Sequence, residues 1–141
     1  MIHTNEFHPM LVHFPVALLL IGLLADISSL VFKKEMCLSK AGLYLLIAGT
    51  LFVVPTVLSG LFFTPALGGE AGDLKEKHEH FALITLSVAI LTSVFRVYLA
   101  FSKKENTNLK WPALGLYILT SALAGITGYL GGILVYRHLI T

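Results

Sequence analysis

Residues 8–26 read HPMLVHFPVALLLIGLLAD, and residues 78–96 read HEHFALITLSVAILTSVFR. Each stretch begins with a histidine and ends 18 positions later with a charged residue, Asp26 in the first and Arg96 in the second. Eighteen residues make five turns of an α-helix, so the two polar side chains of each stretch share one helix face. The pattern predicts two long apolar helices that carry polar groups at both ends of one face.

These two stretches belong to a longer internal repeat. The shift of 70 residues that relates them also brings Lys33-Lys34-Glu35 onto Lys103-Lys104-Glu105. At a shift of 73, the segment GLYLL at 42–46 matches GLYIL at 115–119. We therefore expect two tandem helical hairpins, residues 8–63 and 78–136, related by a pseudo-twofold axis along the membrane normal, an arrangement known among membrane proteins.

The composition is that of an integral membrane protein. Hydrophobic residues make up 56% of the 141 residues and charged residues only 13%, about half the charged fraction of a typical soluble domain. Four apolar stretches, 9–32, 41–63, 80–101 and 111–136, are each long enough to cross a bilayer. The predicted fold class is all-α, a single transmembrane four-helix bundle over residues 1–141.

The net charge of +2 gives no reason to expect nucleic-acid binding, and the one cysteine, Cys37, excludes an internal disulfide.

Lysines and acidic residues are divided between opposite ends of this bundle. The two short loops carry the lysines Lys33, Lys34, Lys40, Lys103, Lys104 and Lys110. The connection at 64–79 carries the acidic residues Glu70, Asp73, Glu76 and Glu79. The positive-inside rule places the lysine-bearing loops in the cytoplasm. We therefore expect a multi-pass protein of the bacterial inner membrane, with both termini on the outer side.

Asp26 and Arg96 are the only ionisable residues deep within the predicted spans. The repeat places them at matching depth near the cytoplasmic end. An isolated charge at that depth costs several kcal/mol, so the pattern predicts a buried ion pair between the two side chains. A structural pair is the favoured interpretation, and a role in proton transfer is the alternative.

All six histidines fall on the expected outer side. His8, His13, His78 and His138 are the candidate ligands of a cofactor or metal ion; His3 and His80 are weaker candidates, because neither lies on the inferred inner faces. The alternative interpretation is that the histidines lie at the interface because span ends tolerate polar groups. The sequence does not decide whether His8 and His78 or His13 and His138 form the ligand pair.

Histidine nitrogen binds haem iron, copper and zinc. Histidines that face each other from different helices suit a haem, and the small residues Ala124, Gly128 and Gly132 would let either a neighbouring helix or a flat macrocycle approach the fourth span. Arg137 could neutralise a haem propionate. No covalent attachment motif C-x-x-C-H is present, so the expected cofactor is haem b, with copper, zinc or iron as the alternative.

The first and last spans also carry two recognisable motifs. Residues 8–15, HPMLVHFP, and residues 128–138, GYLGGILVYRH, resemble the signature stretches of a bacterial family of small four-helix membrane proteins catalogued as a domain of unknown function. Some members of that family resemble membrane modules attached to Rieske-type iron–sulfur or cytochrome c-like domains. In the last motif Ile133 stands where a polar residue often follows the double glycine.

The resemblance implies a four-helix inner-membrane unit that works with redox proteins. Because the chain carries no fused redox domain, we expect a separate redox partner on the outer side, and a homo-oligomer is an open alternative. Hydrolytic motifs such as H-E-x-x-H and G-x-S-x-G are absent. The leading hypothesis is a haem-b-binding electron-transfer module. The alternatives are a non-haem metal-binding or metal-transport protein and a structural subunit of a membrane redox complex.

Overall fold

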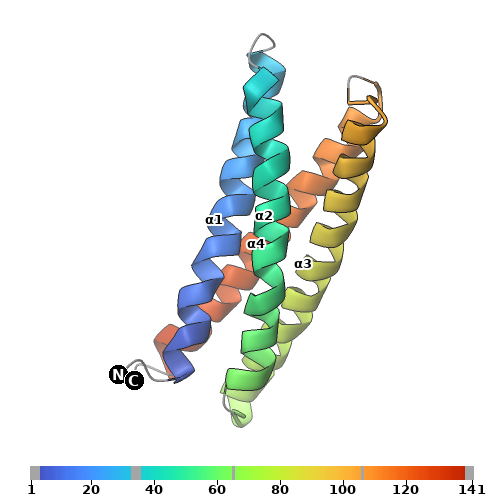
Figure 1. The fold of residues 1–141 in the computed structure, drawn as a ribbon. Coiled ribbons are helices and arrows are strands. Elements are labelled where there is room, and N and C mark those ends of the chain that lie inside the picture. The colour runs from blue at the N-terminus through green and yellow to red at the C-terminus, as the bar shows by residue number, and fades with distance from the viewer. Residues whose placement is uncertain (1–3, 33–35, 65, 106, 139–141) are drawn as a thin grey trace.

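Four long helices make up the described part of the protein (Figure 1), which in this computed structural model comprises residues 4–32, 36–64, 66–105 and 107–138. The helices are α1 (Thr4–Val31), α2 (Met36–Phe63), α3 (Gly69–Phe101) and α4 (Lys110–His138). All four are long and apolar enough to cross a membrane. The predicted all-α transmembrane bundle is therefore confirmed, and the described residues contain no strand.

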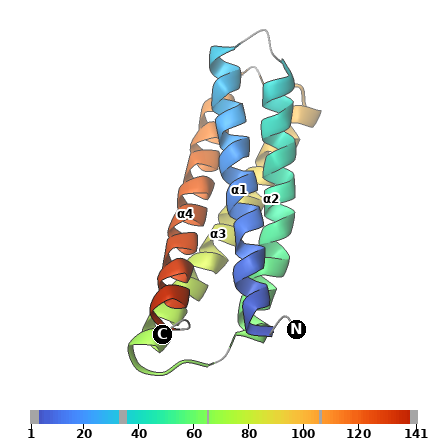
Figure 2. The same cartoon turned by 90° about the vertical axis from the view of Figure 1, so that its left-hand side faces the viewer.

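The helices form two antiparallel hairpins, α1 with α2 and α3 with α4 (Figures 1 and 2). Both ends of the chain lie at the same end of the bundle as the connection between α2 and α3, and the two short loops lie at the other end. In Figure 1 the tips that carry the short loops stand apart from each other. The lysine-bearing and acidic ends predicted from the sequence are thus opposite ends of the bundle.

Helix α3 begins at Gly69, about three turns before the predicted start at His80. The acidic segment expected to be a loop is helical because it contains good helix formers, a glutamate in the first turn and an i,i+4 ion pair. Gly68, in extended conformation, is the residue that precedes the helix. As a result His78 lies within the helix and is only 7% exposed.

The two hairpins bury residues at equivalent positions, but the sequence shift that relates these positions differs slightly between the two pairs of helices. Helices α1 and α3 bury equivalent positions at a shift of 70: Pro15 and Thr85, Leu19 and Ala89, Gly22 and Thr92, Asp26 and Arg96. Helices α2 and α4 do so at a shift of 71: Gly42 and Ala113, Leu46 and Tyr117, Gly49 and Thr120, Val53 and Ala124. The shift of 73 suggested by the GLYLL segment pairs Tyr44, which is 66% exposed, with the fully buried Tyr117. That register therefore does not describe the packing.

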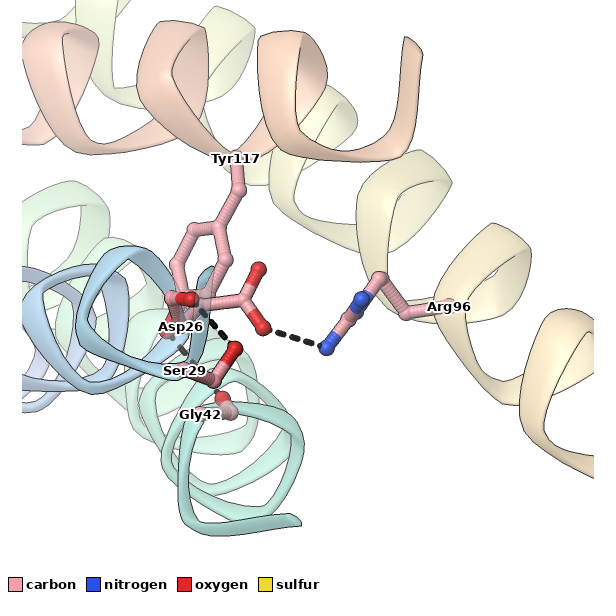
Figure 3. Close-up of polar contacts among 5 residues, drawn as sticks. All are labelled: Asp26, Ser29, Gly42, Arg96 and Tyr117. Atoms are coloured by element: carbon pink, nitrogen blue, oxygen red, sulfur yellow. Dashed lines mark hydrogen bonds and ion pairs between the residues drawn. The ribbon is translucent and has the colours of Figure 1, made fainter. Parts of the chain in front are cut away.

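The ion pair expected from the sequence joins α1 to α3 (Figure 3). Arg96 Nη2 donates a hydrogen bond of 2.7 Å to Asp26 Oδ1, and the two residues are 4% and 5% exposed. At the same level the Tyr117 hydroxyl of α4 donates to the carbonyl oxygen of Gly42 on α2, at 3.3 Å. Tyr117 reaches this position only because Gly22 has no side chain, since a Cβ there would overlap the hydroxyl.

We expect substitution of either member of the pair alone to be strongly destabilising. Asp26→Leu or Arg96→Met leaves one buried charge without its partner and should lower the free energy of unfolding by about 3–5 kcal/mol. The double variant removes both charges and should lose less than the sum of the single losses. Unfolding of the four proteins in detergent micelles measures this, and additive losses would argue against coupling between the two side chains.

The orientation can be tested with the exposed thiol of Cys37 near the short loop of the first hairpin. If that loop is cytoplasmic, a membrane-impermeant thiol reagent should leave Cys37 unmodified in cells with a permeabilised outer membrane. In a Cys37→Ser background, Ala66→Cys places an exposed thiol at the opposite end and should react. The reverse labelling pattern would place the termini inside.

Candidate functional site

His8 of α1 and His78 of α3 face each other at the end of the bundle that carries the chain termini. Their ring centres are 6.0 Å apart and their planes are inclined at 80°. Each lies 18 residues, about 27 Å along its helix, from the charged residue of the ion pair. Helices α1 and α3 therefore meet at an ion pair near one end of the bundle and at a contact between two imidazole rings near the other.

The His78 ring is held by α4. Its Nδ1 donates a hydrogen bond to the carbonyl oxygen of Thr127, at 3.0 Å. The ring lies against Gly131, where a Cβ would come within 3.0 Å of the His78 Cε1 atom. Because a carbonyl oxygen only accepts, the proton is on Nδ1, and Nε2 carries the free lone pair that binds a metal.

The His8 ring is held by α2 in an equivalent way. Its Nδ1 lies 2.8 Å from Ser59 Oγ, and the Ser59 hydroxyl donates to the carbonyl oxygen of Thr56, also at 2.8 Å. Since the one hydroxyl proton is used on Thr56, the oxygen must accept from His8, and the proton is on Nδ1 here as well. Gly60 provides the space, because a Cβ there would lie 2.9 Å from the His8 Cε1 atom.

The two imidazoles therefore occupy the same kind of setting in the two hairpins. A threonine followed four residues later by a glycine, Thr56 and Gly60 in α2, recurs as Thr127 and Gly131 in α4 at the shift of 71 that describes the burial. In the first hairpin the Ser59 hydroxyl lies between the imidazole and the threonine carbonyl, and in the second the contact is direct. Hydrogen bonds of this kind orient histidine ligands in metal sites.

Both imidazoles line a groove of about 660 Å³ that extends between α1 and α4. This volume lies in the range of sites for small molecules and cofactors. The groove extends inward along α1 as far as Leu20, about 18 Å from His8. Its walls are apolar apart from the histidines and a few polar groups near the end of the bundle that carries the chain termini.

Four of the five glycines of α4 line this groove, and three of them leave it open. A Cβ added to Gly125 or Gly132 would meet no atom within 4 Å, and one added to Gly128 would only touch Val16, at 3.6 Å. Ala124, grouped with this stripe in the sequence, belongs to the hydrophobic core. Of the two uses predicted for the small residues, close helix packing does not describe Gly132, and the approach of a ligand stays a prediction.

The other candidates from the sequence are dispersed. His13 also lines the groove, but it is exposed, and its Nδ1 donates to the carbonyl oxygen of Pro9 at 2.8 Å. Arg137 is exposed and is not among the groove-lining residues. The side chain of His138 and all of His3 lie outside the described residues, and His80 is exposed away from the groove.

The sequence analysis missed the polar groups of the groove that lie near the end carrying the chain termini. Lys75 is largely buried, with 17% of its side chain exposed, and its Nζ lies 3.5 Å from Glu79 Oε1 and 3.4 Å from the carbonyl oxygen of Thr64. Lys75 and Glu79 both line the groove. The two residues are four positions apart in the sequence, a spacing that brings side chains together only in a helix. Because this segment was predicted to be a loop, the contact could not be predicted.

In the part of the chain that the structure describes, the histidine pair has no third protein ligand nearby. Among the described residues, no group of three or more histidine, cysteine, aspartate or glutamate side chains is placed to hold a metal ion. The site thus offers two neighbouring imidazoles that both line an apolar groove.

The sequence matches, over residues 4–141, a protein family described as "Predicted membrane protein (DUF2231)". No curated protein and no solved structure gives a significant match.

Adjacent glycines of α4 should differ sharply in their tolerance of a methyl group. Gly131→Ala would press on the His78 ring and should destabilise the protein, whereas Gly132→Ala points into open space and should be neutral or stabilising by up to about 1 kcal/mol from helix propensity. Thermal unfolding of both variants in detergent measures this difference. Equal stabilities would show that the ring can move away from Gly131 at no cost.

Proposed function

The chain belongs to the DUF2231 family of predicted membrane proteins, and we propose that it is a haem-b-binding electron-transfer module of the bacterial inner membrane. In this proposal His8 and His78 are the two axial ligands, and the histidine end of the bundle faces outward. The observation that carries the proposal is the pair of facing imidazoles, each oriented by a hydrogen bond at Nδ1.

The number of ligands favours haem over a bare metal ion. Structural zinc sites use four protein ligands and catalytic zinc sites three, whereas the described residues offer two histidines and no third group. A haem supplies four nitrogens from its own ring and needs only axial ligands from the protein. Two imidazoles meet that need.

The spacing of the rings supports the same assignment. Imidazoles that bind one metal ion from opposite sides, with nitrogens about 2.0–2.1 Å from the ion, have ring centres roughly 6 Å apart. The ring centres of His8 and His78 are 6.0 Å apart. The open surface over Gly125 and Gly132 would accept the flat face of a macrocycle.

When bound, a haem with two axial imidazoles supplies reversible one-electron transfer. The protein's part is to hold the two Nε2 atoms in place through Ser59 and Thr127, and to surround the site with apolar side chains that exclude water. Hydrogen bonds to axial histidines and the burial of the site both tune the reduction potential of a haem. The lysine-bearing loops support an outward-facing site, within reach of a separate redox partner on the outer side.

The absorbance spectrum of the detergent-purified protein tests the proposal. We expect a Soret band and a reduced-minus-oxidised difference spectrum, both lost in His8→Ala and His78→Ala. His80→Ala changes an exposed histidine two positions from His78 and should leave the spectrum intact. His13→Ala should also retain haem if His8 and His78 form the pair.

Two outcomes would contradict haem binding. Stoichiometric copper, zinc or iron by elemental analysis, without a Soret band, would indicate a non-haem metal protein. Neither chromophore nor metal, even after cells are supplied with a haem precursor, would favour a structural subunit whose histidines only join helices.

A further inference from the structure

The groove has different chemistry at its two ends. Lys75 lies three residues before His78 on α3, so the two side chains share a helix face and the ammonium group lies about one turn further out. In the inward direction, Val16, Ala17, Leu20 and Gly125 line the groove with apolar surface only. A ligand in this groove therefore meets the Lys75 ammonium group and its partner Glu79 at one end and apolar side chains at the other.

Haem b has the matching asymmetry, because its two carboxylates lie on one edge and the rest of its periphery is apolar. We infer that Lys75 binds a haem propionate, so that the haem lies with its carboxylate edge outward and its apolar edge toward the middle of the membrane. This inference rests on the proposed function.

The surroundings of Lys75 suit this role. Its stem is largely buried, and its Nζ is positioned by the Thr64 carbonyl and by Glu79, so little side-chain entropy remains to be lost on binding. Glu79 balances the charge while the protein is empty of ligand, and it is the more exposed partner, at 33%. Arg137, the residue favoured by the sequence for this role, is exposed and outside the groove lining.

Binding of haem b and of its dimethyl ester, which has no propionate charge, provides the test. Purified protein in detergent is titrated with each compound. Lys75→Met should weaken binding of haem b about tenfold or more and leave binding of the ester unchanged, because only the free acid loses a charge-assisted hydrogen bond. The double variant Lys75→Met/Glu79→Gln should behave in the same way, which excludes repulsion from an unpaired Glu79 as the cause.

Lys77→Met is the matched control, since Lys77 is an exposed lysine two residues away, and it should affect neither titration. Equal weakening of both compounds by Lys75→Met would show that Lys75 only maintains the structure, and no weakening would show that it takes no part. A loss of haem binding specific to Arg137→Met would assign the propionate to Arg137 instead. Wild-type protein that binds neither compound would overturn the proposed function and this inference together.

Discussion

A charged side chain inside a bilayer needs a partner of opposite charge, and the packing of the two hairpins depends on this constraint. Arg96 on α3 donates a hydrogen bond of 2.7 Å across the bundle to Asp26 on α1. At the same level Tyr117 crosses from α4 to α2. These two contacts connect all four helices at the end where the short loops of the hairpins stand apart. The histidine pair connects α1 and α3 again at the other end.

The helices of the two hairpins make contact at equivalent positions, but the residue types at these positions differ. In the first, Gly22 and Gly49 let α1 and α2 approach closely, and the Leu19 side chain fills the space over Gly49. The equivalent positions of the second hairpin are Thr92 and Thr120, whose hydroxyls hydrogen-bond to each other at 2.9 Å. Small residues and hydroxyl pairs are the two common ways to join helices in lipid. The two halves of the repeat therefore share the positions at which their helices touch, but not the residue types that make the contact.

The same difference appears at the histidines and bears on the proposed cofactor. His78 is oriented by a main-chain carbonyl, which no single substitution removes, whereas His8 depends on the side chain of Ser59. The groove beside them exists because Gly125 and Gly132 face neither another helix nor the core. A cofactor bound as proposed, with one ligand from each hairpin, would also make its binding depend on how the hairpins are held together. The Asp26–Arg96 pair, about 27 Å away along the helices, is part of that geometry.

Much of this organisation can be predicted from the sequence, because it depends on local periodicity and on the free-energy cost of placing a charge in the bilayer. The four apolar runs indicate four helices, the lysines indicate the two loop ends, and the five-turn spacing of His8 with Asp26 and of His78 with Arg96 puts each pair on one face. The ion pair follows, since two deep charges of opposite sign at equal depth have no better partner.

Other features were decided by the tertiary structure. Helix α3 extends back to Gly69 because its charged first turns are stabilised by contacts within the helix and with the Thr64 carbonyl, and apolarity alone could not show this. The repeat relates α2 to α4 at a shift of 71 and not 73. The buried positions of the two helices match at 71, whereas a shift of 73 pairs the exposed Tyr44 with the buried Tyr117. Side chains from other helices occupy the space beside some glycines and leave it empty beside others, and the sequence does not show which. The sequence by itself determined which residues are polar in an apolar chain and at what depth; the tertiary structure decided which of them meet, because meeting depends on contacts between helices far apart in the chain.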